Sequence, residues 1–102
     1  REYFDSADYL RKTFNMYNGE PELIELRCSN TLLETITDKF GSGIEFSCHD
    51  ENAFTVRARV YVSDGLIEWL LQYGNRIVVQ SPQKLKQEMM LRIRQMQEAY
   101  QI

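Results

Sequence analysis

The sequence predicts an α+β domain made of two similar halves, and a repeat together with the hydrophobic pattern carries that prediction. Residues 29–34 read SNTLLE and residues 63–68 read SDGLIE, so both segments begin with serine and carry an apolar pair before glutamate. An aromatic residue followed by glycine then closes each segment, at 40–41 and at 73–74. Runs of alternating apolar residues, which are typical of strands, flank both segments. The pattern therefore predicts a strand, a helix and a second strand in each half.

A further helix is predicted ahead of the duplicated part, within residues 1–20. Asp5 is a favourable N-cap residue, and apolar side chains between Ala7 and Phe14 share one face at helical spacing. The Asn-Gly pair at 18–19 then breaks the chain. Residues 1–20 are therefore expected to form a separate helical segment.

The duplicated part, residues 21–82, predicts four strands and two helices. Strands are expected at 22–29, 44–48, 53–63 and 76–80, and helices at 31–40 and 65–73. Ser29 and Ser63 are expected to cap the two helices, whereas Gly41 and Gly74 can adopt the positive φ angle that ends a helix.

A final helix is predicted within residues 83–102. Ser81-Pro82 opens it, because proline is favoured at the first helical position. One side of this amphipathic helix carries apolar side chains at helical spacing: Leu85, Met89, Ile93, Met96 and Tyr100. This row must be buried against the sheet of its own domain or against a partner.

Two β-α-β units in tandem predict a ferredoxin-like βαββαβ sandwich. Each right-handed crossover leaves a gap for a strand of the other unit, which gives an antiparallel sheet of order 4-1-3-2 with both helices on one face. The side chains expected to face the helices are Ile24, Leu26, Cys28, Ile44, Phe46, Phe54, Val56, Ala58 and Val60. A helical solenoid is rejected, because it needs at least three stacked copies. Since strand 3 separates strands 1 and 2, Cys28 and Cys48 are expected to be free thiols.

The composition indicates one globular domain and argues against several classes of protein. The chain has 102 residues, of which 43% are hydrophobic and 26% charged. No run approaches the roughly 18 apolar residues that cross a membrane, and no signal peptide is visible. The net charge of −3 argues against a nucleic-acid binder, although residues 83–102 are mildly basic. Because the chain opens on Arg1 and has two unpaired cysteines, we expect an excised piece of a cytoplasmic protein.

The other face of the predicted sheet is the expected contact surface for a ligand or a partner. Arg27, Arg57, Arg59 and Tyr61 are predicted to converge there on the two central strands. Arginine binds phosphate, and tyrosine can stack on a base, so a nucleotide or nucleic-acid effector is conceivable. Two glutamates on the same face can instead pair with the arginines, which would leave an ordinary solvated surface.

Trp69, Met89 and Met96 are candidate interface residues. Trp69 is expected toward the edge of its helix, where core packing is the favoured interpretation and a role in assembly is the alternative. The methionines of the last helix suit adaptable interfaces as well as irregular gaps in a core.

The sequence contains no motif for catalysis, metal binding or a cofactor. His49 is the single histidine and lies in a polar turn, without enough ligands nearby for a metal site. No nucleophile–base pair, Gly-rich phosphate loop or Cys/His cluster is present. We therefore expect neither enzyme activity nor a bound cofactor.

Two stretches resemble the C-terminal part of the WYL-domain bacterial transcription regulators. Residues 4–19 (FDSADYLRKTFNMYNG) are similar to the helix that ends the WYL module, with Phe14, Met16 and Gly19 close to its F-x-M-x-x-G pattern. Residues 60–89 are similar to the C-terminal extension called WCX, where the most recognisable features are an apolar strand, a helix carrying Trp69, the aromatic-Gly stop at 73–74, Pro82 and Leu85.

The resemblance implies the role of a regulatory module. In such regulators a helix-turn-helix reader and a WYL module precede this extension, which is similar in fold to ferredoxin-like domains and is thought to help dimerisation and effector response. Residues 1–20 would then be the tail of the WYL module, 21–82 the WCX domain and 83–102 its C-terminal helix. We therefore expect a homodimerising, effector-sensing domain that does not read DNA by itself and is not bound to a membrane.

Two other functions were compared with this one. A stand-alone nucleic-acid-binding module of the RNA-recognition type would lose affinity steeply with salt, but the negative charge and the lack of paired aromatics on strands 1 and 3 argue against it. A small enzyme similar to acylphosphatases would need a positioned catalytic group, and the sequence offers none.

Overall fold

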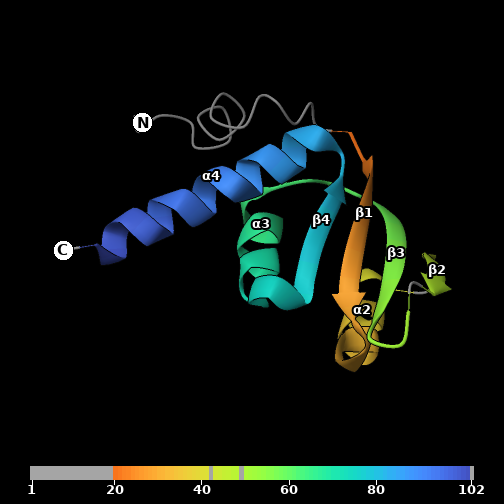
Figure 1. The fold of residues 1–102 in the computed structure, drawn as a ribbon. Helices are drawn as coiled ribbons and strands as arrows, with labels where there is room; N and C mark the ends of the chain where they lie inside the picture. The colour runs from red at the N-terminus through yellow and green to blue at the C-terminus, as the bar shows by residue number, and fades with distance from the viewer. Residues whose placement is uncertain (1–19, 42, 49, 102) are drawn as a thin grey trace.

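The computed structural model describes residues 20–41, 43–48 and 50–101, so the helix predicted within residues 1–20 lies almost entirely outside the described residues. Figure 1 shows the order of the elements. They are β1 (Glu22–Ser29), the 3-10 turn η1 (Asn30–Leu32), α2 (Leu33–Phe40), β2 (Glu45–Cys48), β3 (Ala53–Val60), α3 (Asp64–Leu71), the 3-10 turn η2 (Gly74–Arg76), β4 (Ile77–Ser81) and α4 (Gln83–Tyr100). The predicted α+β class is confirmed.

The four strands form one antiparallel sheet in the order β2-β3-β1-β4. β1 is central and pairs with β3 along its whole length, from Glu22 opposite Val60 to Ser29 opposite Ala53. On its other edge β1 pairs with β4, where Leu26 lies opposite Val79. The register shifts between Glu25 and Leu26 on that side, so β4 follows β1 only part of the way.

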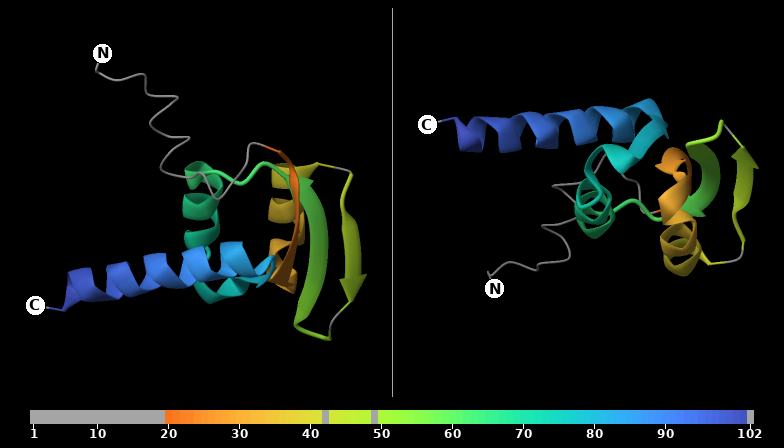
Figure 2. Two further views of the ribbon diagram at one scale, coloured as in Figure 1. Left: turned by 90° about the horizontal axis from the view of Figure 1, so that it is seen from above. Right: turned by 60° about the horizontal axis from the view of Figure 1, so that its bottom comes forward.

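The hydrophobic core lies on the face of the sheet that carries the alternating apolar residues. Ile24, Leu26 and Cys28 of β1 are completely buried, as are Ile36 of α2 and Ile67 of α3. Both views of Figure 2 show α2 and α3 running beside each other next to the sheet. The alternation in β1 therefore positions one face of the sheet against these helices, as expected for a half-buried strand.

Serine caps and glycine stops bound the two helical segments as the repeat predicts. The Ser29 hydroxyl accepts a hydrogen bond from the backbone N–H of Thr31, and the Ser63 hydroxyl accepts one from Leu66. Gly41 and Gly74 follow the helices with φ angles of 82° and 58°, which residues with a Cβ rarely adopt. A 3-10 turn precedes α2, and α3 ends at Leu71, so both helices are shorter than predicted.

The predicted end of β3 needs correction, and Phe46 of β2 is less buried than the alternation predicts. β3 ends at Val60 and not at residue 63, because Val60 lies opposite Glu22, the first residue of β1, and no strand in the described part of the chain pairs with β3 beyond it. Phe46 lies opposite the buried Val56, on the helix side of the sheet as predicted, but it is 46% exposed, and its ring contacts Phe54 at a centroid distance of 5.7 Å. β2 is a four-residue strand at the edge of the sheet, where the layer of helices does not fully cover it.

α4 packs against the domain only at its beginning. Leu85 and Met89 are buried in the core, but every residue from Ile93 to Gln101 is exposed. Figures 1 and 2 show the helix leaving β4 and extending away from the sheet and the other helices. No described helix, α4 included, is both long and apolar enough to cross a membrane.

Leu26→Ala should lower the free energy of unfolding by about 2–5 kcal/mol, because it opens a cavity between the sheet and the helices. Leu33→Ala is the matched control: Leu33 is 51% exposed, so its loss should cost less than about 1 kcal/mol. Urea titration followed by circular dichroism measures both, and equal losses would contradict a core centred on β1.

Candidate contact surfaces

The open face of the sheet carries a row of charges that neutralise one another. Arg57 of β3 lies directly between Glu25 of β1 and Glu45 of β2 in the strand register. Its Nε atom is 3.7 Å from Glu25 Oε1, and its Nη1 atom is 4.0 Å from Glu45 Oε1. These side chains are substantially exposed, so each pair adds only a few tenths of a kcal/mol to stability. The positive charge of Arg57 is therefore largely balanced by two carboxylates of its own sheet.

The other predicted site residues lie on the same side of the sheet but at separate places. Arg27 is opposite Thr55. Its Nη2 atom lies 3.5 Å from Oδ2 of Asp50, which is in the turn before β3. Arg59 is opposite Leu23, four residues further along β3 than Thr55, which corresponds to about 14 Å along the strand. Tyr61 lies beyond the end of β3 and is 66% exposed. The predicted convergence into one site is therefore not what the register produces.

Thr55 is a buried polar residue on the open face of the sheet. It is almost completely buried, and its hydroxyl finds no hydrogen-bond partner among the residues that the structure describes. Arg27 and Ser47 lie opposite it on the two neighbouring strands. Arg57 and Arg59 share its face of β3 and are exposed, and the alternation along the strand does not distinguish Thr55 from them.

Trp69 is engaged within the domain. Its ring meets Phe40 of α2 edge-on at a centroid distance of 5.7 Å, and Tyr73 at 5.0 Å. The Lys39 ammonium lies 5.1 Å from the centre of the same ring. Trp69 is half-buried and packs against the core cluster, so it joins the end of α2 to α3.

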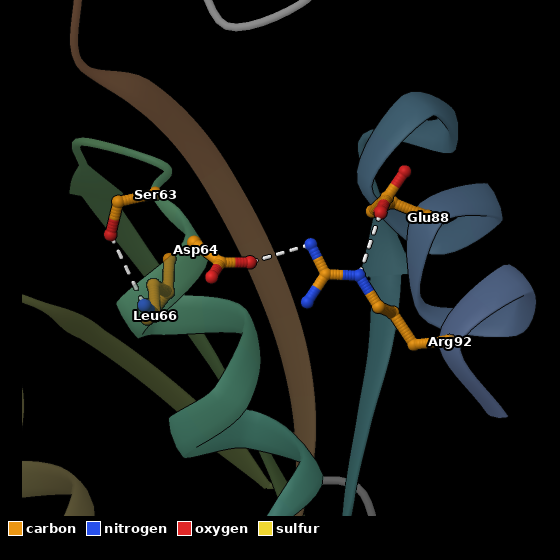
Figure 3. A network of polar contacts seen from close by, with 5 residues as sticks. All are labelled: Ser63, Asp64, Leu66, Glu88 and Arg92. Carbon is orange, nitrogen blue, oxygen red and sulfur yellow. Dashed lines mark hydrogen bonds and ion pairs between the residues drawn. The ribbon is translucent and has the colours of Figure 1, made fainter. Parts of the chain in front are cut away.

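An arginine holds α4 to α3, as Figure 3 shows. The Arg92 Nη2 atom donates to Asp64 Oδ1 at 2.6 Å, and its Nε atom donates to Glu88 Oε2 at 2.9 Å. Burial would lower the pKa of Arg92, but the hydrogen bonds and the charges of the two carboxylates raise it above its ordinary value. Asp64 is in the first turn of α3, where a carboxylate also interacts favourably with the helix dipole. The network fixes where α4 crosses the start of α3.

An apolar groove of about 460 Å³ lies beside this network. Its walls are Leu71 at the end of α3, the first half of β4 and the side of α4 that carries Met89, Met90, Ile93 and Met96. Met89 is buried, whereas Met96 is half-exposed on the part of α4 that has left the domain. Two of the predicted interface residues, Met89 and Met96, therefore line one groove, and Trp69 does not line it.

Cys28 is a buried thiol with low reactivity. Burial in the core raises its pKa to about 12, and it forms no disulfide. Within the described ranges, no group of three or more histidine, cysteine, aspartate or glutamate side chains is placed to hold a metal ion. Reactive or ligating cysteines need a lowered pKa and accessibility, and Cys28 has neither.

Arg92→Met should lower the free energy of unfolding by about 1–3 kcal/mol, because the mostly buried Glu88 carboxylate loses its partner. Arg94→Met on the same helix should change it by less than about 0.5 kcal/mol, because Arg94 is exposed. Chemical denaturation of both variants measures the difference. If the two substitutions had the same effect, the Arg92 network would not hold α4 in place.

Cys28 should react with a thiol reagent only after unfolding. With a pKa of about 12, roughly one Cys28 in ten thousand is a thiolate at pH 8, and the core also excludes the reagent. The measurement is the rate of maleimide labelling of a Cys48→Ser variant, in which Cys28 is the remaining cysteine, with and without denaturant. Fast labelling of the native protein would show that Cys28 is accessible.

Comparison with known proteins identifies the family. Residues 20–97 match the family model of the WCX domain, and this range includes almost all the residues that the structure describes. No curated protein matches the sequence significantly. The match covers both β-α-β units, the Arg92 network and the groove under α4, so the chain belongs to the WCX domain family, the C-terminal extension of WYL-domain regulators.

Proposed function

We propose that this chain is the C-terminal regulatory module of a WYL-type bacterial transcription regulator and that it acts through contacts with other protein surfaces. The observation that carries the proposal is the match to the WCX domain over residues 20–97. The helix-turn-helix and WYL modules of the same regulator, and a second copy of the chain, are the proposed partners, in the cytoplasm. Effector response is the second part of the proposed role, with a nucleotide or nucleic acid as the candidate effector.

The proposed architecture is a ferredoxin-like sandwich. What supports it is the strand order β2-β3-β1-β4 together with the chain order of strands and helices, since each helix connects two strands that have one other strand between them. This fold by itself is compatible with many functions, so the functional proposal rests on the family and on the surfaces.

A role in contacts, without catalysis, agrees with the chemistry of the surfaces. Arg57 is paired with two carboxylates, and Arg27 lies beside Asp50, so these cations are partly neutralised by the domain itself. The groove under α4 is lined almost entirely by apolar side chains and contains one charged residue, Lys86. Such a surface excludes water and packs against another apolar surface, whereas acid–base chemistry needs titratable groups brought together.

Nucleic-acid binding by the sheet is the weaker alternative. On the open face, the two central strands present Leu23, Glu25 and Arg27 from β1 and Thr55, Arg57 and Arg59 from β3. RNA-recognition sheets use aromatic side chains at such positions to stack on bases, and none of these six is aromatic. Tyr61 lies past the end of β3 and lacks an aromatic partner on β1 within the described residues.

Sedimentation and titration experiments on the chain test the proposal. We expect concentration-dependent self-association and, if the open face contacts an effector or a subunit, a change in association or in nucleotide binding on Arg59→Glu. Arg76→Glu makes the same change in charge on η2 and should leave nucleotide binding unchanged. An unchanged Arg59→Glu variant would remove the open face from the proposed site.

A monomer at every concentration would contradict the oligomerisation role. If such a monomer also bound oligonucleotides with an affinity that fell steeply with salt, the chain would be a nucleic-acid module.

A further inference from the structure

The second half of α4, from Ile93 onward, projects from the domain and is exposed to solvent along its whole length. The helix is anchored by Leu85, Met89 and the Arg92 network, and nothing in the described part of the chain packs on its later turns. Isolated helices of this length are marginally stable in water, and most helical stability in proteins comes from packing of an apolar face. The sequence nevertheless keeps that part of α4 regularly helical up to Tyr100.

The exposed turns of α4 carry an apolar stripe. Met90 and Ile93 are 54% and 53% exposed, Met96 is similarly exposed, and Tyr100 is 85% exposed. Their separations of three, three and four residues place them along one side of the helix. The stripe borders the groove whose opposite wall is formed by Leu71 and by β4, including the half-exposed Val78. The described part of the domain therefore leaves an apolar helix face beside an apolar groove, and no side chain of that part fills the space between them.

The stripe is symmetric about Ile93. Met90 and Met96 each lie three residues from Ile93, and Lys86 and Tyr100 each lie seven residues from it. A second α4 placed antiparallel, with a twofold axis at Ile93, would therefore set Met90 against the partner's Met96 and Lys86 against the partner's Tyr100. A twofold axis uses the same surface on both chains and closes after two copies, so no apolar stripe remains uncovered.

The charges of α4 fit an antiparallel partner. The first turn of α4 contains no acidic residue and the last turn no basic residue, so neither end carries the charge that stabilises a helix dipole. Lys86 follows the first turn and lines the groove, whereas Glu98 lies in the last turn. In the antiparallel arrangement, Lys86 of each copy approaches the negative C-terminal end of the other helix and the face of the tyrosine ring.

We propose that α4 pairs antiparallel with α4 of a second copy, with Ile93 at the twofold axis and the partner's side chains entering the groove beneath it. This inference rests on the proposed function, because it names the surface through which the module would associate. It also gives the Arg92 network a role: by fixing the point where α4 crosses α3, Arg92 sets the direction in which the stripe is presented to the second copy.

Ile93→Glu tests the pairing against a matched control. At the axis it would bring two carboxylates together in an apolar contact, so we expect the dissociation constant of the dimer to rise roughly a hundredfold or more in sedimentation equilibrium. Leu91→Glu adds the same charge to an exposed residue on the opposite side of α4 and should leave the constant within a few-fold of wild type. Circular dichroism of both variants checks that each is folded, as expected because both positions are exposed.

Cross-linking tests the position of the twofold axis. In a Cys48→Ser background, Ile93→Cys should form a disulfide-linked dimer under a mild added oxidant, because a residue on the axis faces its own copy. Leu91→Cys should form little dimer under the same conditions.

The outcomes separate this inference from the proposed function. A dimer that is insensitive to Ile93→Glu and does not cross-link through Ile93→Cys would overturn the pairing of α4 and leave the oligomerisation role intact. A wild-type chain that stays monomeric would overturn both.

Discussion

The fold depends on one constraint: β1 must be buried on one face and paired along both edges. Ile24, Leu26 and Cys28 have no exposed surface, and β3 and β4 supply the two neighbouring ladders. A strand in this position removes its own backbone groups from water and provides hydrogen-bond partners to two other strands. Both strands that flank β1 come from the second β-α-β unit, and β1 and β2 do not pair with each other, so the two halves of the sequence cannot form their sheets separately. The two copies of the repeat therefore build one common hydrophobic core.

The two surfaces outside this core, the open sheet face and the apolar stripe of α4, differ in whether their side chains have partners within the domain. On the open sheet face, Glu25, Arg57 and Glu45 form a row of alternating charge, so each carboxylate has a nearby cation and the surface is stable in water as it stands. On α4, the apolar stripe has water on one side and a groove on the other. Exposed apolar surface is what a protein gains most by covering, which is why α4, and not the sheet, is the surface from which we infer a partner.

Much of the fold was predictable from the sequence because its signals are local. Ser29 and Ser63 are caps, Gly41 and Gly74 are stops, and alternation in β1 and β3 marks the buried face. The errors arose where a distant element decides the outcome. Phe46 alternates like a buried residue but lies on an edge strand that the helices do not fully cover. Arg27 and Arg59 share a face, yet the register separates them by four residues along the strand.

The contacts of Arg92 between α4 and α3 show which part of the structure could be predicted from the sequence and which part could not. Glu88 and Arg92 have the four-residue spacing of a helical ion pair, so half of the network is a local pattern that could have been recognised. Its other half, the contact of Arg92 with Asp64, joins residues 28 positions apart and exists only because α4 leaves β4 at one particular angle. That angle follows from burying Leu85 and Met89, and it also carries the later turns of α4 away from the sheet. The core therefore decides where α4 starts, and the half-buried Arg92 helps to hold the direction in which the helix leaves the domain.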